Sequence, residues 1–223
     1  MSILDAVPRR LFVLTLIIGL SVVHFARIAV AQDAQPVREI RVTRFSPSPD
    51  LKAHDVELIL EAASRIFVKR DCPGDVACPI TLRLERFTHR THLGTFSSQQ
   101  EEVQAHRDTD SLVLIVNRID DAACSDRGGA GRILGCTGPA NDWMAVVRYP
   151  PGIGAGIVWA HEYSHACGNG HREEKCALMR AYLYPDSKAV SKKECVAIRG
   201  ALPVGTPAPA KKSAPKGKAS TAP

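Results

Sequence analysis

Eleven residues constrain this 223-residue chain more than any other stretch. They run from His161 to His171 and read His-Glu-Tyr-Ser-His-Ala-Cys-Gly-Asn-Gly-His. Because residues four apart lie on the same face of an α-helix, His161 and His165 can both reach one metal ion. Gly168 has no Cβ and can take a positive φ, which ends the helix and lets the chain turn back. His171 then arrives as a third nitrogen ligand.

Three neutral imidazoles with an open fourth position are typical of a catalytic zinc site. We therefore expect one zinc ion, Zn²⁺, held by His161, His165 and His171. Glu162 projects from the same helical turn, beside the metal but outside its ligand set. A carboxylate in that place is predicted to act as a general base toward water.

The stretch resembles the metzincin signature of zinc metalloproteases, H-E-x-x-H-x-x-G-x-x-H. Ala177-Leu178-Met179 looks like the Met-turn that underlies the zinc in this clan, at the short interval of matrixin-like members. The resemblance covers residues 37–200 and gives Gly168 and Met179 supporting roles. It implies an α+β fold, with a twisted, mostly parallel five-stranded sheet and an antiparallel edge strand. The active-site helix and a second long helix pack on that sheet, and a small C-terminal subdomain holds the Met-turn and a final helix.

The activity implied by the resemblance is that of a secreted zinc endopeptidase, which uses zinc-activated water and Glu162 on a peptide or protein substrate. Two alternatives remain open at this point. One is a zinc hydrolase of a non-peptide amide or ester, and the other is a non-catalytic zinc-binding module. The chain also departs from better-known members. There is no long pro-domain, Ala181 stands where some families have a metal-interacting tyrosine, and no acidic calcium-loop pattern occurs.

The N-terminal residues predict export. Arg9 and Arg10 precede an apolar run, and Ala29-Val30-Ala31 is a small-x-small cleavage site, so residues 1–31 read as a secretory signal peptide. The protein is expected to be secreted or periplasmic, without stable membrane insertion after cleavage. An uncleaved anchor is the alternative, although His24 and Arg27 leave the apolar run short of a full span. Residues 201–223, rich in Pro, Ala and Lys, are predicted to be a disordered tail.

Residues 32–200 are expected to form one peptidase domain. They hold 22 basic and 22 acidic residues, and this balance argues against a nucleic-acid partner. All seven cysteines lie after the predicted cleavage site, which indicates disulfides formed in an oxidising compartment. Connectivity cannot be read from sequence. Short loops favour Cys72–Cys78 and Cys124–Cys136. Cys176–Cys195 could then join the Met-turn to the last helix, which leaves Cys167 free.

Apolar periodicity predicts the remaining elements. Strands are expected at 37–45, 80–85, 111–116 and 143–149, and helices at 51–68, 98–107, 156–167 and 191–200. Asp50 is the expected N-cap of the first helix, while Ser98 with Glu101 and Ser191 with Glu194 form possible capping boxes.

The glycine-rich stretch before residue 138 is the candidate for the edge strand. Arg132 to Thr137 would form it, and a plain disulfide-tied loop is the alternative. His89 and His92 are expected to be surface residues in a polar loop, with a second metal site as the less favoured reading. Tyr182, Tyr184 and Pro185 are expected in the wall of the pocket beside the zinc.

Overall fold

The computed structural model describes residues 35–45, 50–91, 94–124 and 133–200. The chain divides into two units, Met1–Gln35 and Pro36–Pro223, and every described helix and strand lies in the second. The predicted signal peptide, the C-terminal tail, Arg132 and His92 all lie outside the described residues. Within the described ranges, no helix combines the length and the apolar character that a membrane span needs.

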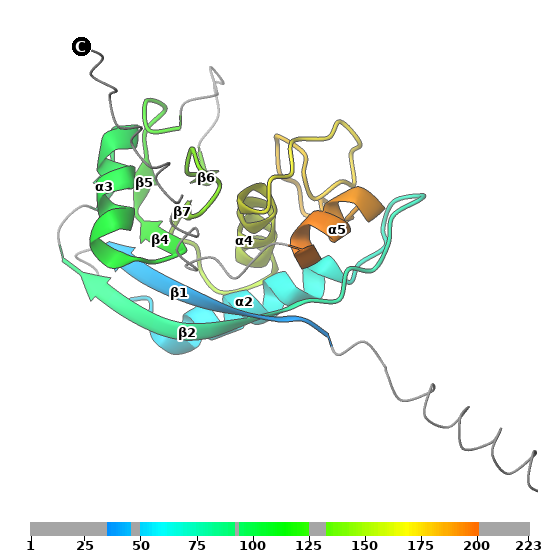
Figure 1. Ribbon diagram of the computed structural model, residues 1–223, viewed down its shortest axis with the longest axis horizontal. Helices are drawn as coiled ribbons and strands as arrows, with labels where there is room; N and C mark the ends of the chain where they lie inside the picture. Colours follow the sequence, from blue (N-terminus) through cyan, green and yellow to red (C-terminus); the bar gives the residue numbers. More distant parts are fainter. Residues whose placement is uncertain (1–34, 46–49, 92–93, 125–132, 201–223) are drawn as a thin grey trace, which may run out of the picture. The chain divides into compact units, whose positions relative to one another are not determined.

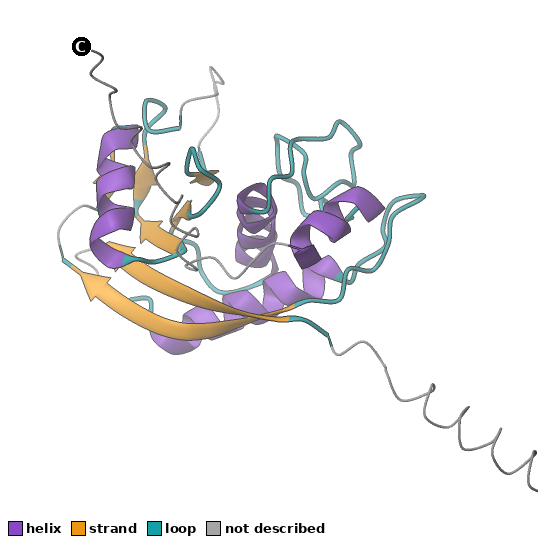
Figure 2. Cartoon of the chain, in the orientation of Figure 1, coloured by secondary structure: helices purple, strands orange, loops and turns teal. Residues whose placement is uncertain are grey.

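A five-stranded sheet organises the second unit, with strand order β2-β1-β4-β7-β6 (Figures 1 and 2). Its strands are β1 (Val37–Phe45), β2 (Thr81–Arg90), β4 (Val113–Val116), β6 (Gly135–Thr137) and β7 (Met144–Val147). The β1, β2, β4 and β7 strands run parallel, and β6 pairs antiparallel with β7 at one edge. The α+β class, the mostly parallel sheet and the antiparallel edge strand agree with the sequence prediction.

Both faces of the sheet are covered, because consecutive side chains of a strand point to opposite sides. The four residues of β4 are all buried: Val113 and Ile115 belong to one core, and Leu114 and Val116 to the other. The first core includes residues of α2 (Ala53–Phe67), α4 (Ile153–Ala166) and α5 (Lys192–Gly200). The second includes Ala105 of α3 (Gln99–Thr109). The unbroken apolar run of β4 thus marks a strand buried on two sides.

Helix α4 packs directly on α2. A Cβ at Gly156 would lie 2.7 Å from the Cβ of Ala62, so only glycine allows the two helices to approach this closely. On α2, the apolar residues Val56, Ile59, Leu60 and Phe67 are buried. The position of α4 is therefore set by its close packing against α2.

Several predicted boundaries need correction. Helix α2 is capped at Lys52 and not at Asp50; the Asp55 side chain accepts a hydrogen bond from the Lys52 amide at 2.8 Å, while Asp50 pairs with Arg148 at 3.0 Å. Strand β2 runs on to Arg90, which places His89 in the strand instead of a loop. Helix α4 begins three residues earlier than predicted, at Ile153.

A small parallel sheet of β3 (Thr95–Phe96) and β5 (Arg118–Ile119) was not predicted. Strands of two residues are too short to show an alternating pattern. The capping box of Ser191 and Glu194 is confirmed, with hydrogen bonds of 2.6 and 3.2 Å between each side chain and the other residue's amide.

The disulfide prediction was right for one pair and wrong for two. Cys124–Cys136 is present and Cys167 is the free cysteine, but the other bridges are Cys72–Cys176 and Cys78–Cys195. The short loop from Cys72 to Cys78 does not close on itself. Its Val76 amide donates to the Val190 carbonyl at 3.0 Å, so the loop lies against the C-terminal region and both of its cysteines find partners there.

Candidate metal centre

Helix α4 supplies two histidines and a glutamate to the candidate site. Most residues of the helix are buried, and His161 and Glu162 are only 2 % and 4 % exposed. The helix ends at Ala166 with Cys167 as its C-cap, and Gly168 then takes a φ of +84°, as the sequence predicted for that glycine. The positive φ turns the chain back toward the helix.

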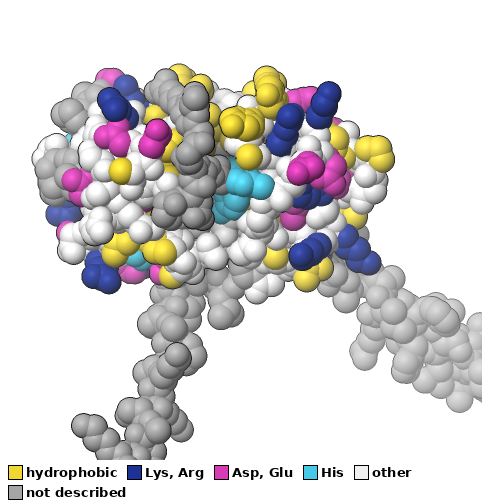
Figure 3. All heavy atoms as spheres, turned by 90° about the horizontal axis from the view of Figure 1, so that it is seen from above, with side chains coloured by type: hydrophobic (Ala, Val, Ile, Leu, Met, Phe, Trp, Pro, Cys, Tyr) yellow, Lys and Arg dark blue, Asp and Glu magenta, His cyan; other side chains and the backbone are white. Residues whose placement is uncertain are grey.

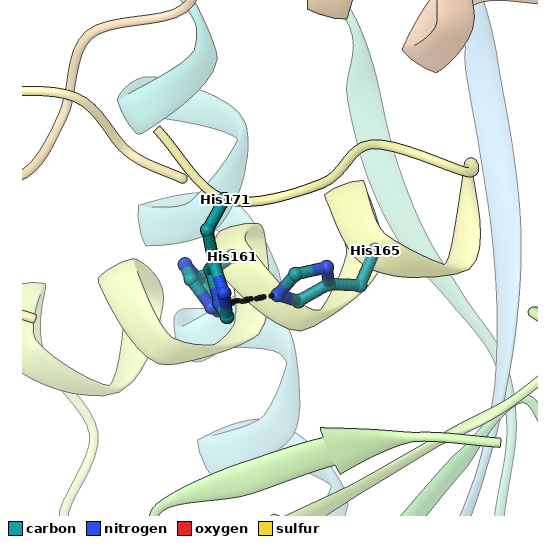
Figure 4. A group of neighbouring side chains, drawn as sticks. All are labelled: His161, His165 and His171. Atoms are coloured by element: carbon teal, nitrogen blue, oxygen red, sulfur yellow. Dashed lines mark hydrogen bonds between the residues drawn. The ribbon is translucent and has the colours of Figure 1, made fainter. Parts of the chain in front are cut away.

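Three imidazoles converge at this turn (Figure 4). The Nε2 atom of His165 lies 3.0 Å from Nε2 of His161 and 3.0 Å from Nε2 of His171. Tetrahedral zinc with Zn–N bonds of about 2.0–2.1 Å would hold two nitrogens about 3.3 Å apart. Both measured distances are close to that value, and the three histidines could hold a metal ion.

Hydrogen bonds at the opposite ring atoms orient two of the imidazoles. Nδ1 of His161 lies 2.7 Å from the Leu178 carbonyl, and Nδ1 of His165 lies 2.8 Å from the Asn169 carbonyl. A carbonyl only accepts, so each Nδ1 carries the proton and each Nε2 keeps its lone pair. Adjacent lone pairs at 3.0 Å repel one another unless a cation lies between them. The donor set therefore fits a metal ion.

The loop after α4 brings His171 to the other two histidines. The Gly168 amide donates to the His165 carbonyl at 2.8 Å, and the Asn169 amide donates to the Ser164 carbonyl at 3.1 Å. The Asn169 side chain adds a hydrogen bond to the Ser164 hydroxyl at 3.0 Å. The turn is fixed by these contacts.

Met179 is fully buried in the segment that comes after this loop. Its carbonyl accepts from the Arg172 amide at 2.7 Å, next to His171, and the preceding carbonyl of Leu178 orients His161. The Ala177-Leu178-Met179 segment thus lies directly under the histidine cluster.

Arg172 ties the third histidine to the rest of the fold. Its guanidinium lies 3.2 Å from Asp75 and 3.4 Å from Glu194. The two carboxylate side chains are only 4 % and 6 % exposed. A cation between two buried carboxylates is strongly held, because its loss would leave them without compensation. Sequence reasoning missed this residue, since its partners are distant in the chain.

Glu162 lies between the histidines and the edge strand. Its Oε1 atom is 3.9 Å from Nε2 of His161, and its Oε2 atom is 3.3 Å from the Thr137 hydroxyl of β6. A Cβ at Gly135 would lie 2.6 Å from the Glu162 Cγ, so β6 passes close over this side chain. The sequence placed Thr137 at the end of the predicted edge strand but did not predict its contact with Glu162.

A second group of possible metal ligands joins Glu102 to Cys124 and Cys136. These two cysteines form a disulfide, and disulfide sulfurs lack the thiolate that binds metals. Burial and, to a smaller degree, the charge of Glu162 raise the pKa of Glu102 to about 8. Glu102 is accordingly a neutral acid behind the candidate site, and the group carries no metal-binding role.

The histidine cluster opens to solvent on one side. His161 is buried, His165 is half-buried and His171 is exposed. Figure 3 shows histidine side chains reaching the surface beside hydrophobic ones. Tyr182 and Tyr184 are 63 % and 47 % exposed, and their place in a pocket wall stays a prediction. A cavity of about 490 Å³ beside β5 is lined by other residues.

Comparison with known proteins gave distant structural similarities alone. No family model and no curated protein sequence matches the chain. A metalloproteinase-II from Bacteroides fragilis aligns with 74 % of this chain at 12 % identity and a TM-score of 0.47, and the alignment spans about half (53 %) of its own length. Archaemetzincin from Methanopyrus kandleri aligns with 77 % of this chain and 97 % of its own, at 12 % identity and a TM-score of 0.48. Similarities this remote leave the function to be argued from the site.

Proposed function

We propose that this chain is a zinc-dependent endopeptidase of the metzincin type, with His161, His165 and His171 as the zinc ligands. The observation that carries the proposal is the convergence of three Nε2 atoms beside a buried carboxylate. Structural zinc sites usually fill the fourth position with Cys or His. Cys167 is the nearest cysteine in the sequence, and it is not among the side chains that converge on the three imidazoles. The fourth position is therefore left for water or substrate.

The chemistry needs no serine or cysteine nucleophile. When bound, zinc polarises a carbonyl group and lowers the pKa of a water molecule toward neutrality. Glu162 takes the proton from the attacking water and delivers it to the leaving amine. Its Oε1 atom, 3.9 Å from His161 Nε2, is on the side of the carboxylate that faces the metal ligands.

The edge strand supplies a place for an extended substrate. In the strand order of the described sheet, β6 is the last strand, with β7 on its inner side. A peptide can add to the free edge of a strand through main-chain hydrogen bonds, which demand no particular side chain. Because β6 passes over Glu162, such a peptide would carry its scissile bond past the base. This geometry favours peptides and proteins as substrates over small amides or esters.

An exported location is part of the proposal. Three disulfides join the described cysteines, and disulfides of this kind persist in oxidising compartments. Together with the predicted signal peptide of residues 1–31, they support a secreted or periplasmic protein.

The proposal is tested by incubating the purified mature chain with an unfolded protein, with and without a zinc chelator. We expect cleavage that the chelator stops and that added zinc restores. Bound zinc with no cleavage of any unfolded protein would favour a non-catalytic module or a non-peptide hydrolase. Cleavage that persists in chelator would contradict the zinc mechanism.

A further inference from the structure

We propose that Thr137 of the edge strand is a positioning residue for Glu162, fixing the orientation of the carboxylate through its hydroxyl group. The inference rests on the proposed function of Glu162 as the general base and adds a residue that acts through it. Thr137 lies on β6 and Glu162 on α4, so the contact joins the edge strand to the active-site helix.

The two oxygens of Glu162 have different surroundings. Oε1 lies 3.9 Å from Nε2 of His161, while Oε2 lies 3.3 Å from the Thr137 hydroxyl. A general base must present one oxygen to the water and cannot let the carboxylate rotate freely. A hydrogen bond to Oε2 leaves Oε1 on the side of the histidines.

The Thr137 hydroxyl has a second acceptor in reach, the Glu162 carbonyl at 3.2 Å. A hydroxyl carries one proton and favours the stronger acceptor. A carboxylate accepts more strongly than a peptide carbonyl, so the hydroxyl donates to Oε2.

The backbone of β6 is placed to make this contact. Gly135 has no side chain, and a Cβ there would meet the Cγ of Glu162 at 2.6 Å. The missing side chain lets the strand approach the glutamate, and Thr137, two residues on, points to the same face of the strand. Cys136, which stands between Gly135 and Thr137, is anchored by its disulfide to Cys124. Strand β6 thus serves as a fixed support for the base.

The test compares Thr137→Val, which keeps the branched shape and removes the hydroxyl, with Thr137→Ser, which keeps the hydroxyl. The control is Thr95→Val, the same change on β3 and outside the site. A hydrogen bond to a charged group corresponds to about 10- to 100-fold in rate. We expect Thr137→Val to lower kcat by that factor with KM and zinc affinity unchanged, and Thr137→Ser and Thr95→Val to stay close to wild type.

A double variant separates positioning from a structural role. In the Glu162→Gln background, Thr137→Val should cost less than about threefold in the residual rate, because the group it positions is gone. A full additional loss there, or a Thr137→Val enzyme as active as wild type, would overturn the inference.

Crystal structures of zinc-loaded wild type and Thr137→Val give a readout that does not depend on activity. We expect one carboxylate orientation of Glu162 in the wild type and a rotated or divided one in the variant. An inactive wild type would refute the proposed peptidase, whereas an active wild type with Glu162 unmoved in the variant would refute this inference alone.

Discussion

Two regions of the molecule build the candidate site by different means. Helix α4 provides His161, Glu162 and His165 from within two helical turns, so their relative positions follow from helix geometry and from burial against α2. The region from Asn169 to Val190 provides His171 and Met179 and contains only isolated bridges of regular structure. Long-range contacts hold it in place: the Cys72–Cys176 disulfide and the ion pairs of Arg172.

The difference teaches that the ligands are not equally secure. A helix buried on its packing face keeps its ligands in register even when contacts around it are lost. A loop keeps its ligand in place only while its long-range contacts are intact, because a loop without them regains conformational freedom. Changes in α4 should therefore affect chemistry, and changes in the C-terminal region should affect metal affinity and stability.

The largest effect is expected from Glu162→Gln in α4. General acid–base catalysis contributes about 10²- to 10⁴-fold, and the variant should lose activity by that factor. Because Glu162 is not a proposed zinc ligand, zinc content should stay at one ion per chain. Steady-state kinetics and metal analysis of the same preparation check both halves. Activity near the wild-type level would rule out Glu162 as the base.

The next effect is expected from the paired substitution Cys72→Ala with Cys176→Ala. This bridge spans 104 residues, and in the chain-entropy model a loop of that size contributes about 4.7 kcal/mol to the free energy of unfolding. Cys176 comes five residues after the third histidine, so zinc affinity should fall as well.

The matched control is Cys124→Ala with Cys136→Ala. That bridge spans 12 residues and lies beside β6, and its loss should cost about 3 kcal/mol and leave zinc affinity unchanged. Denaturant unfolding and competition with a zinc chelator measure the two quantities. Equal zinc affinity in both double variants would contradict the view that His171, unlike the two ligands on α4, depends on long-range contacts for its position.

Arg172→Met tests the ion pairs of Arg172 with Asp75 and Glu194 and leaves every disulfide unchanged. It leaves Asp75 and Glu194 buried without their cation, which should cost about 3 kcal/mol of unfolding free energy. Groups that support a metal ligand usually change affinity by about 10- to 100-fold, and we expect zinc affinity to fall within that range. In Arg65→Met, which breaks an exposed pair with Glu61, stability should change by about 0.5 kcal/mol or less. Similar losses in the two variants would contradict the role of Arg172.

How much of the fold and the site could be predicted from the sequence depends on the range of the contacts. The helix, its three site residues and the turn at Gly168 were predicted, because each is set by neighbours within a few residues. The mostly parallel sheet and its antiparallel edge strand were predicted from a family resemblance, and the order of the strands was not predicted. Four contacts were not predicted, because they join residues 25 to 117 positions apart: Cys72–Cys176, Cys78–Cys195, Arg172 with Asp75, and Thr137 with Glu162.

A pH-dependent effect is expected from Glu102, a buried acid with a raised pKa. The pKa of Glu102 is about 8 in the folded protein, against an ordinary value of 4.5. Between these two pH values, Glu102 is protonated in the folded protein and ionised in the unfolded chain. The folded state binds more protons between these values, so stability falls as the pH rises from about 4.5 to 8.

Glu102→Gln removes that contribution while keeping a neutral side chain of similar shape. The variant should therefore gain stability over the wild type as the pH rises through this window. The exposed substitution Glu61→Gln serves as the control. Unfolding curves measured at several pH values check the trend, and a difference between variant and wild type that does not grow with pH would contradict it.

The most direct test of a catalytic zinc centre is X-ray absorption at the zinc edge on the purified mature protein, combined with metal analysis. We predict one zinc ion per chain with three nitrogen ligands at about 2.0–2.1 Å and one oxygen ligand in the fourth position. A sulfur ligand at about 2.3 Å would show a closed structural site, and a protein that binds no zinc would contradict the central claim.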